Sequence, residues 1–402
     1  MPPRSQPNRP IKVVHVITRM ILGGAQENTL LTCEGLHDAP QWDVTLVTGP
    51  ALGPEGELIG RARKHGIRTV VVPSMRRAIN PVRDATAFAR ICNIFRHIDP
   101  DIVHTHSSKA GILGRLASRA TRVPVTVHTI HGLPFHRFLS VAPNAAFIAA
   151  ERLGARCCDR LICVADTMAK QAIDAGVGTP DQYTTIYSGM EVEKFRQADK
   201  HRDKVRREFG FEPDDFVIGK IARLFHLKGH RYVLRAAPSI IQKCPRAQFF
   251  FVGDGILREE LEHLARELRI RDHVVFAGLV DSARIPEMIG AMDMLVHASL
   301  REGLPRAIVQ ALLGGRPVVS YDVDGAPEVV LDGITGYLVR PQSVDELAAG
   351  IIDLAQNRPR ASRMGREGQE RFTDQFRAST MVGKIENIYK NLFDTTLVHH
   401  IR

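Results

Sequence analysis

The stretch that decides the fold, residues 297–330, reads HASLREGLPRAIVQALLGGRPVVSYDVDGAPEVV. Its centre, residues 306–313, is apolar on nearly every side. Pro305 before it suits the first position of a helix, because its φ is fixed and it has no N–H to satisfy. Two glycines then end the helix, and the apolar run at residues 317–321 follows as a buried strand. The pattern predicts a buried helix that leads into a strand of an α/β sheet.

A ligand site is expected just ahead of this helix. The backbone N–H groups of Gly303 and Leu304 point out of the helix start, where the helix dipole also favours negative charge, so they would hold a phosphate. Glu302 stands beside that position. A carboxylate repels phosphate, so its expected partner is a neutral polyol whose hydroxyls donate to it. The combination suggests a nucleotide sugar; the competing interpretation is an ordinary loop with a solvated Glu.

Length and composition are those of an ordinary globular protein. The 402 residues are 44% hydrophobic and 24% charged, and this length exceeds what one core usually serves, so two domains are expected. The six cysteines show no pairing or metal-ligand pattern, which favours a reducing, cytoplasmic setting without disulfides or metal. Residues 1–10 are polar and proline-rich, and no run approaches the roughly 20 apolar residues of a membrane span, so neither signal peptide nor span is expected.

The net charge of +10 is uneven along the chain. Residues 61–137 hold 14 Lys and Arg against 3 Asp and Glu. A patch of this density attracts anionic lipid head groups, nucleic acid or phosphorylated acceptors, although cations kept for solubility explain most individual residues equally well. Nucleic acid is not expected as a partner, because neither a nucleic-acid motif nor interleaved aromatic residues accompany the charge.

Strand-like apolar runs alternate with helical patterns along the whole chain, which predicts parallel sheets covered by helices on both faces. The expected strands are residues 11–18, 44–48, 69–72, 102–105, 125–128, 161–164, 184–186, 217–221, 248–252, 274–276, 294–297, 317–321 and 336–339. The clearest helical patterns are residues 25–36, 81–97, 110–120 and 379–392.

A charged, turn-rich segment at residues 189–215 interrupts this alternation. We therefore expect an N-terminal domain over residues 1–195 and a C-terminal domain over residues 196–375. The last helix, about residues 376–402, is expected to cross back to the first domain. Two doubly wound α/β domains would then face each other across a cleft, with ligands at the carboxyl ends of the strands.

The loops after these strands carry a set of motifs. They read GGAQE at 23–27, HTHSSKAG at 104–111, HTIHG at 128–132, ARLFHLKG at 222–229, VGDGILR at 252–258 and REGLPRAIVQAL at 301–312. In this order the set resembles the family 4 glycosyltransferases (glycosyl transferases group 1) over about residues 11–389. The resemblance implies a GT-B fold of two Rossmann-like domains, a nucleotide-sugar donor held mainly by the second, and transfer that needs no metal or cofactor and retains the donor's anomeric configuration.

The resemblance assigns roles in the second domain. Arg223 and Lys228 would clamp the diphosphate and neutralise the departing nucleoside diphosphate. The physics agrees, because fixed cations shielded from water stabilise charge that grows on a leaving group. Glu302 would contact hydroxyls of the donor sugar, and the amides of Gly303 and Leu304 would complete the phosphate cradle.

Position 310 departs from the family pattern. Most members carry a second acid there, which binds the ribose hydroxyls, whereas this chain has Gln310. A neutral acceptor contributes about 1 kcal/mol against roughly 1.5 to 3 kcal/mol for a charged one, so weaker donor binding with retained activity is expected.

The resemblance also assigns roles to the first domain. His131, before Gly132, matches the active-site His near the reacting sugar, where a neutral imidazole can hydrogen-bond a hydroxyl or the developing charge. Gly23 and Gly24 match a glycine loop whose backbone approaches the donor phosphate and the acceptor. The remaining assignments are Gly253, which would turn the chain beneath the donor, and Gln26, His106 and Lys109, which are expected on the acceptor side.

Residues 133–158 are predicted to contain an amphipathic helix. In relatives that build surface polysaccharides, this region and the basic patch face the membrane and a polyprenyl-linked acceptor. A helix packed on its own domain explains the pattern equally well.

The sequence thus predicts a retaining, metal-independent glycosyltransferase that moves a hexose or N-acetylhexosamine from a nucleotide sugar, expected to be UDP-linked, to a glycan or polyprenyl-linked acceptor in polysaccharide synthesis. Its expected place is the cytoplasm, at the inner face of the plasma membrane, with an anionic membrane surface as a further partner. Two alternatives are kept. One is a nucleotide-sugar epimerase on the same fold, which the set of Arg223, Lys228 and E-G-L-P disfavours. The other is a non-catalytic homologue, which only Gln310 supports.

Overall fold

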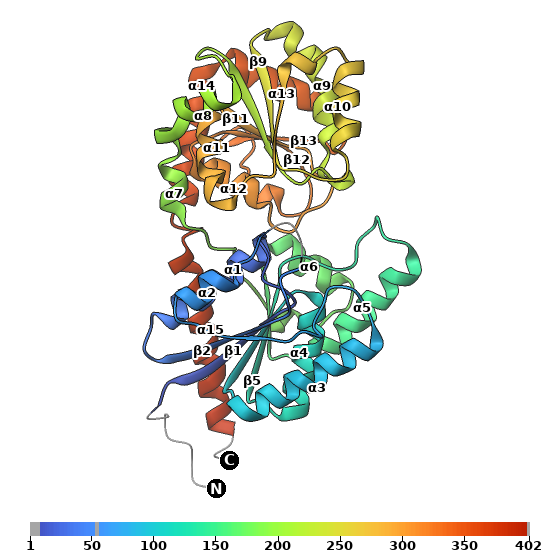
Figure 1. Ribbon diagram of the computed structural model, residues 1–402, viewed down its shortest axis with the longest axis vertical. Coiled ribbons are helices and arrows are strands. Elements are labelled where there is room, and N and C mark those ends of the chain that lie inside the picture. Colours follow the sequence, from blue (N-terminus) through green and yellow to red (C-terminus); the bar gives the residue numbers. More distant parts are fainter. Residues whose placement is uncertain (1–8, 53–55, 400–402) are drawn as a thin grey trace. The chain divides into compact units, whose positions relative to one another are not determined.

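The computed structural model describes residues 9–52 and 56–399 (Figure 1). The chain divides into two compact units, one built from the residues up to Met190 together with those from Ala378 onward, the other from Glu191–Arg377. The boundaries expected from the sequence were 195/196 and 375/376. Most of the polar leader and the last three residues of the expected final helix lie outside the described residues.

The first unit contains a seven-stranded parallel sheet in the order β3-β2-β1-β4-β5-β6-β7. The central strands are buried on both faces, which explains their nearly continuous apolar sequence. The strands are β1 (Ile11–Ile17), β2 (Trp42–Thr48), β3 (Arg68–Val71), β4 (Ile102–His106), β5 (Val125–Ile130), β6 (Arg160–Cys163) and β7 (Tyr183–Thr185).

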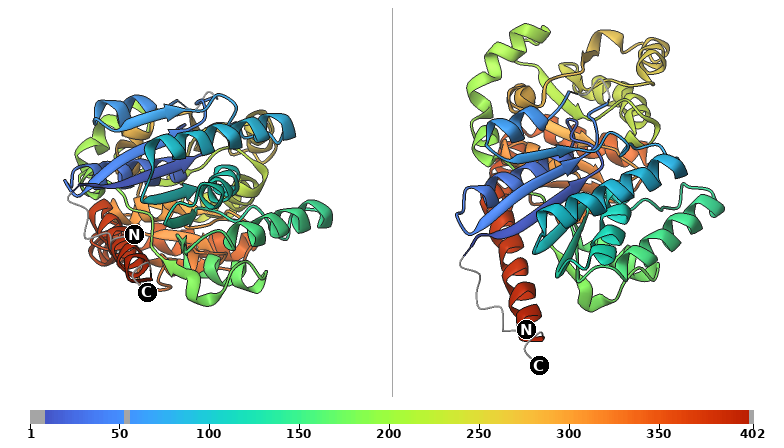
Figure 2. Two further views of the ribbon diagram at one scale, coloured as in Figure 1. Left: turned by 90° about the horizontal axis from the view of Figure 1, so that it is seen from below. Right: turned by 60° about the horizontal axis from the view of Figure 1, so that its bottom comes forward.

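Helices cover both faces of this sheet. Alternate residues of β1 point to opposite faces, so Val13 and Ile17 join one core cluster and Val14 and Val16 another. The first cluster lies under α1 and α15, and the second under α3 and α4 (Figures 1 and 2). The helices of this unit are α1 (Gly24–His37), α2 (Ile59–Lys64), α3 (Pro81–Ile98), α4 (Ser108–Thr121), α5 (Val141–Ala155), α6 (Asp166–Asp174), α15 (Ala378–His399) and the short η1 (Pro180–Gln182).

The crossing of the last helix to the first unit, expected from the sequence, is present in the structure. α15 begins one residue before the predicted pattern and runs to His399. Met381, Ile385 and Tyr389 enter the core cluster of the first unit, and Glu386 accepts a 2.6 Å hydrogen bond from the Trp42 indole. A segment from the end of the chain therefore completes the core of the first unit.

The second unit contains a six-stranded parallel sheet in the order β10-β9-β8-β11-β12-β13. The strands are β8 (Phe216–Ile221), β9 (Ala247–Val252), β10 (Val274–Gly278), β11 (Met294–His297), β12 (Val318–Tyr321) and β13 (Gly336–Val339). Its helices are α7 (Val192–Arg196), α8 (Arg202–Phe209), α9 (His230–Lys243), α10 (Arg258–Glu267), α11 (Ile285–Ala291), α12 (Arg306–Leu313), α13 (Val344–Gln356) and α14 (Arg358–Phe372), with short turns η2 (Ala198–His201), η3 (His226–Lys228), η4 (Arg271–His273), η5 (Ser282–Arg284) and η6 (Ala326–Glu328).

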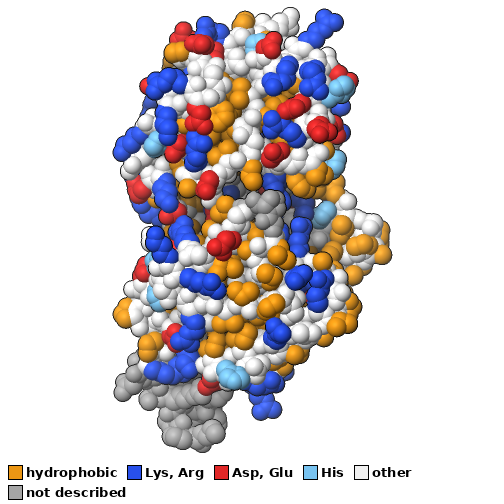
Figure 3. Space-filling model, in the orientation of Figure 1, with side chains coloured by type: hydrophobic (Ala, Val, Ile, Leu, Met, Phe, Trp, Pro, Cys, Tyr) orange, Lys and Arg blue, Asp and Glu red, His pale blue; other side chains and the backbone are white. Residues whose placement is uncertain are grey.

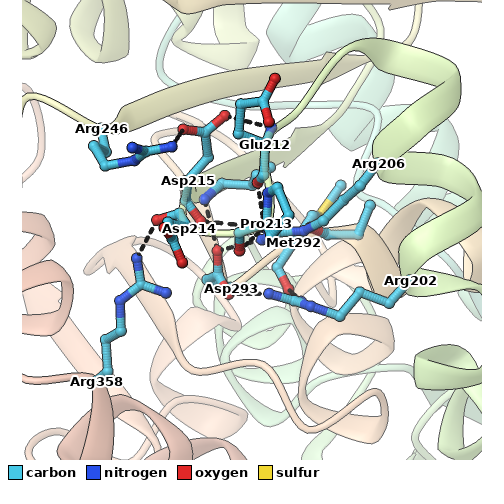
Figure 4. Close-up of polar contacts among 12 residues, drawn as sticks. Arg202, Arg206, Glu212, Pro213, Asp214, Asp215, Arg246, Met292, Asp293 and Arg358 are labelled. Carbon is cyan, nitrogen blue, oxygen red and sulfur yellow. Dashed lines mark hydrogen bonds and ion pairs between the residues drawn. The ribbon is translucent and has the colours of Figure 1, made fainter.

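The charged segment before β8 belongs to this second unit. Arg206 is buried, donates to Asp293 at 2.7 Å, and also donates to the carbonyls of Glu212, Pro213 and Asp215 (Figure 4). Asp293 also accepts a hydrogen bond from the backbone N–H of Val217 at the start of β8. Buried ionic contacts attach this segment to the second unit together with scattered buried apolar residues such as Phe195 and Val205, so the apolar periodicity is interrupted by charged positions.

The helix of the opening stretch is present, but Pro305 is not its first residue. α12 starts at Arg306, and Pro305 precedes it with ψ of 88°, outside the helical region. Its carbonyl nevertheless accepts from the N–H of Ile308, as the residue before a helix does. The helix ends before Gly314, and Gly315 takes a positive φ of 72°, as the two glycines predict.

Candidate active site

Three side chains of the second unit meet at the carboxyl ends of β8 and β11. Lys228 closes the turn η3 after β8, His297 ends β11, and Glu302 lies in the loop that follows. The Lys228 Nζ donates to Glu302 Oε1 at 2.7 Å, and His297 Nε2 lies 3.1 Å from the same oxygen. The Glu302 side chain is only 13% exposed, so these contacts replace most of its water.

The charge of Glu302 is fixed by these neighbours. Burial opposes its ionisation, but the Lys228 ammonium and the hydrogen bond from His297 outweigh burial and hold the pKa of Glu302 well below its usual range. Burial lowers the pKa of His297 although Glu302 opposes the shift, so this ring is neutral at physiological pH. The group is therefore a carboxylate held by one ammonium and one neutral imidazole.

The motifs predict that Lys228 binds phosphate and Glu302 binds sugar hydroxyls, whereas the structure pairs the two side chains with each other. The two paired side chains can still bind a ligand. An ammonium has three N–H groups and a carboxylate two oxygens, so Lys228 keeps two donors and Glu302 keeps Oε2 for a ligand. A ligand here would add to the ion pair without breaking it.

Hydrogen bonds to the loop after β12 hold the loop that carries Glu302 in place. Asp324, at a positive φ of 47°, accepts the backbone N–H of Glu302 at 2.7 Å. The N–H of Gly325 donates to the Gly303 carbonyl at 3.2 Å. Asp324 was not predicted as a site residue, although the D-x-D-G run after a strand signals a tight turn at that edge.

Two glycines let the loops of this edge approach one another. A Cβ at Gly229 would lie 1.8 Å from the carbonyl oxygen of Ala298, and one at Gly253 would lie 2.3 Å from that of Ala222. Both residues also have positive φ, 71° and 132°. The Lys228 loop therefore packs on the chain after β11 only because residue 229 has no side chain.

The other predicted residues of the second unit lie near this group or along α12. Arg223 follows β8 and is exposed, with its guanidinium 4.9 Å from the centre of the Phe225 ring. Leu304 is buried, and Gly303 precedes it in the Glu302 loop. Gln310 is half-buried on α12, and its side chain is a neutral acceptor at the position where an acid is usual.

Two buried basic groups behind Lys228 were missed from the sequence. Lys220 on β8 is fully buried, and its Nζ has no hydrogen-bond partner among the described residues. Burial, aided by the Lys228 charge and opposed by Glu302, lowers the pKa of Lys220 to about 7. His230 is buried at the start of α9, and neither of its ring nitrogens has a partner. The available signal was a lysine inside an otherwise apolar strand, FVIGKI.

The predicted residues of the first unit separate into two places. Gln26 and Lys109 line a cavity of about 560 Å³ together with Arg19 and Arg77. Lys109 is already paired with Asp84 at 2.8 Å. His106, predicted on the acceptor side, is instead fully buried, because it lies on the sheet face that α15 covers.

His131 and the glycine loop are the remaining predicted site residues of the first unit. His131 follows β5 and is half-buried, with its Nε2 3.1 Å from His106 Nδ1. Gly24 is the first residue of α1 and Gly23 precedes it. Gly23 has an extended backbone, φ 172°, so its conformation alone does not demand glycine.

Each of the two units matches the model of a known protein family. The model of the glycosyl transferases group 1 matches residues 201–371, and that of the glycosyl transferase 4-like domain matches residues 23–189. An Escherichia coli relative, the UDP-Gal:alpha-D-GlcNAc-diphosphoundecaprenol alpha-1,3-galactosyltransferase, is 28% identical over 94% of this chain and 96% of its own length. The putative glycosyltransferase EpsD of Bacillus subtilis is 26% identical over 80% of this chain and 84% of its own.

Solved structures show the same fold. Anabaena HepE in complex with UDP-glucose superimposes with a TM-score of 0.81 at 22% identity, covering 95% of this chain and all of HepE. WaaG, a glycosyltransferase of lipopolysaccharide biosynthesis, gives 0.73 at 17% identity, covering 94% of this chain and 99% of its own. Two parallel sheets flanked by helices, with these neighbours, show that the chain has the GT-B fold. The chain belongs to the family 4 glycosyltransferases, which confirms the resemblance and the fold predicted from the motifs.

Proposed function

We propose that this glycosyltransferase transfers a hexose or N-acetylhexosamine from a UDP-sugar to a polyprenyl-diphosphate-linked glycan, with retention of the anomeric configuration and without a metal or other cofactor. The observation that carries the proposal is the Lys228–Glu302–His297 group at the strand ends of the second unit. The E. coli relative, which by its name uses UDP-Gal and a GlcNAc-diphosphoundecaprenol acceptor, supports the choice of substrates.

The chemistry assigned to this group follows from its charges. The spare N–H groups of Lys228 and the guanidinium of Arg223 bind the donor diphosphate, and Glu302 Oε2 accepts hydrogen bonds from sugar hydroxyls. As the bond between C1 and the diphosphate oxygen breaks, the negative charge that grows on the diphosphate is met by two fixed cations. This neutralisation is the task that a divalent metal performs in other enzymes, which supports metal independence.

Retention follows when the acceptor attacks the face that the diphosphate leaves. The acceptor oxygen forms the new bond to C1 while its proton passes to the departing diphosphate oxygen, so no enzyme base is consumed. His131 hydrogen-bonds a hydroxyl of the reacting sugar as a neutral imidazole. Glu302 is an unsuitable base, because its lowered pKa makes it a weak proton acceptor.

The cavity of the first unit supports a lipid-linked acceptor. Its lining combines apolar side chains such as Ile112, Leu113 and Phe147 with the cations Arg19 and Arg77. A volume of about 560 Å³ falls in the usual range of small-molecule sites. Apolar walls beside guanidinium groups suit the diphosphate and the first isoprene units of a polyprenyl carrier.

The same region of the first unit supports contact with the cytoplasmic face of an anionic membrane. Large apolar side chains are exposed on the segments that border the cavity, Val141 by 86%, Val82 by 77% and Ile79 by 75%. Figure 3 shows apolar side chains gathered on the projecting segment of α5. No helix in the described part of the chain has the length and hydropathy to span a bilayer, so the proposed contact is peripheral.

Vesicle sedimentation tests the membrane contact. Vesicles rich in phosphatidylglycerol should pellet the protein, neutral phosphatidylcholine vesicles should not, and salt should weaken the binding. The double variant Val82→Ser and Val141→Ser should stay in the supernatant. Ile256→Ser is the matched control, since Ile256 is 70% exposed in the second unit. Equal pelleting of both variants, or none by the wild type, would refute the contact.

A panel of nucleotide sugars tests the transfer itself. The purified protein is incubated in EDTA with UDP-, GDP- and dTDP-sugars and a synthetic GlcNAc-diphosphate lipid, with products read by mass spectrometry and the new linkage by NMR. One UDP-sugar should give a glycosylated lipid with the anomeric configuration of the donor. Interconversion of free nucleotide sugars without acceptor would instead identify an epimerase, and absence of transfer and hydrolysis with every donor would identify a non-catalytic protein.

A further inference from the structure

A series of ring side chains lies in the core of the first unit behind His131. His131 Nε2 is 3.1 Å from His106 Nδ1, and His106 Nε2 is 3.0 Å from His15 Nδ1. The series continues more loosely from His15 Nε2 to the Tyr389 hydroxyl at 3.5 Å, and then tightly from that hydroxyl to His104 Nδ1 at 2.5 Å. The last contact joins His104 Nε2 to the hydroxyl of Thr129 at 2.7 Å.

Strand register brings these rings together. His15 pairs with His104 across β1 and β4, and His106 pairs with Thr129 across β4 and β5. Residues 104 and 106 are two apart, so both rings point to the face covered by α15, where Tyr389 sits. The rings of His104 and His106 have centroids 4.3 Å apart. The two histidines of the H-x-H pattern in β4 thus belong to a polar series inside an apolar core. We call this series the seam; its members are His131, His106, His15, Tyr389, His104 and Thr129.

The three central histidines are neutral. His15, His104 and His106 are all fully buried. Burial lowers the pKa of His15 to about 3 and those of His104 and His106 well below their ordinary value. A neutral imidazole carries one N–H donor and one bare acceptor nitrogen, so the bond at one nitrogen dictates the role of the other. The tautomer of each ring is therefore tied to that of its neighbour.

Two arrangements satisfy every contact and also give the Tyr389 hydroxyl proton an acceptor within the series. A third, in which the Tyr389 oxygen accepts from both His15 and His104, leaves that proton without an acceptor in the series. In the first, each donor points away from His131, from its Nε2–H through His106, His15, Tyr389 and His104 to Thr129. In the second, every donor points back, and His131 Nε2 accepts from His106. Each arrangement leaves a defined tautomer at His131, since its Nε2 must either donate or accept throughout the series. A ring of the wrong tautomer would leave a buried nitrogen unpaired, which costs about 1–3 kcal/mol.

A metal ion is the competing occupant of this cluster. His15, His104 and His106 offer ligand atoms within 4.8 Å of one another. Both nitrogens of each of the three rings already have a partner within the seam. An ion would have to displace Tyr389 or Thr129, and it would find no water-accessible open position among fully buried rings. The hydrogen-bonded arrangement accounts for all six nitrogens.

We propose that His106, His15 and Tyr389 are positioning residues that hold the ring orientation of His131 for its contact with the sugar and tie its tautomer to the direction of the hydrogen bonds along the series. The inference rests on the proposed role of His131. It gives the last helix a part in catalysis, because Tyr389 is supplied by α15 and closes the seam. Residues more than 370 positions apart in the sequence, 15 and 389, thereby act on one imidazole.

Tyr389→Phe tests the proposal with the smallest change, since it removes only the hydroxyl. His15 Nε2 and His104 Nδ1 then lose their partner, and the tautomers of His15, His106 and His131 are no longer tied to that of His104. We expect kcat to fall about tenfold, the equivalent of one buried hydrogen bond, with less than a twofold change in the KM for the donor. The nitrogen-15 spectrum of His131 should show a changed ratio of its two tautomers. Thr129→Val, at the far end, should act in the same direction.

Tyr321→Phe is the matched control, because the Tyr321 hydroxyl is buried in the second unit without a partner. It should leave kcat and the His131 spectrum unchanged. A wild-type kcat together with an unchanged His131 spectrum in Tyr389→Phe and Thr129→Val would overturn the proposal, as would one equivalent of tightly held metal found by elemental analysis. The spectrum needs no substrate: an inactive wild type whose His131 tautomer still depends on Tyr389 would refute the proposed function and leave the seam standing.

Discussion

At the scale of single residues, the site of the second unit is a set of charges whose states are fixed by their neighbours. Glu302 stays ionised although it is nearly buried, because Lys228 and His297 share one of its oxygens. Lys220 is buried nearby, and in the part of the chain that the structure describes its Nζ has no hydrogen-bond partner. The sequence motifs pointed to Lys228 and Glu302, but they could not show that the two form an ion pair, since the distance between residues 74 positions apart depends on the tertiary structure.

The buried ammonium of Lys220 predicts a stability that depends on pH. The pKa of Lys220 is lowered to about 7 in the folded chain, from the ordinary value of 10.5. The folded state binds fewer protons than the unfolded state between these values, so the penalty is full below pH 7 and gone above pH 10.5.

Lys220→Met should therefore be more stable than the wild type at pH 7, by at most about 4 kcal/mol. The gain should vanish as the pH approaches 10.5. Urea unfolding at several pH values measures it, with the exposed Lys243→Met as control. A gain that is the same at pH 7 and pH 10 would show that Lys220 is not held in an unfavourable charged state.

Replacing Gln310 by Glu should increase the affinity for the donor. If Gln310 contacts the ribose, Gln310→Glu replaces a neutral acceptor by a charged one, which is worth about 1 kcal/mol or a roughly fivefold lower Kd for UDP. Titration calorimetry measures this, and Gln356→Glu on the exposed end of α13 controls for the added charge. An unchanged Kd would remove residue 310 from the donor site.

At the scale of elements, apolar runs predicted all thirteen strands that the structure describes, because a strand buried on both faces carries its signal locally. Periodicity also located α12 and the crossing helix α15. It could not show that His104 and His106 contact His15 and Tyr389, since a pattern reports which face a residue occupies and not which ring it meets. Asp324 was missed for the same reason, because its partner is the backbone of another loop.

In the loop between β8 and α9, one added methyl group at Gly229 should affect both stability and donor binding. Gly229→Ala would force a Cβ to within 1.8 Å of the Ala298 carbonyl, in addition to the cost of its positive φ. Gly210→Ala is the matched control, because Gly210 has φ 74° and no heavy atom within 4 Å of its Cβ position.

Gly210→Ala should cost about 1 kcal/mol of unfolding free energy and leave the KM for the donor unchanged. Gly229→Ala should cost more than the control and raise that KM severalfold, because the displaced loop carries Lys228. Denaturant unfolding and steady-state kinetics measure the two effects. Equal costs and equal KM values in both variants would show that the close approach of the two loops is unimportant.

At the scale of the whole molecule, the chain is two doubly wound units, and the first is completed by the last helix of the chain. The sequence indicated this plan through repeated alternation of strand and helix and a charged segment between the halves. It misplaced the boundary by a few residues, because α7 (Val192–Arg196) of the second unit begins soon after Met190 and is too short to show a periodic pattern. Cores are therefore predictable from local pattern, whereas a boundary inside a charged segment with short helices is not.

The central claim is that Lys228, in its pair with Glu302, acts on the donor diphosphate. The most direct measurement is the turnover of Lys228→Ala with the donor selected by the nucleotide-sugar panel, beside that of Lys243→Ala. The account predicts a loss of about 100-fold or more in kcat for Lys228→Ala, with a folded protein and an unaffected control. Turnover of Lys228→Ala within a few-fold of the wild type would contradict it.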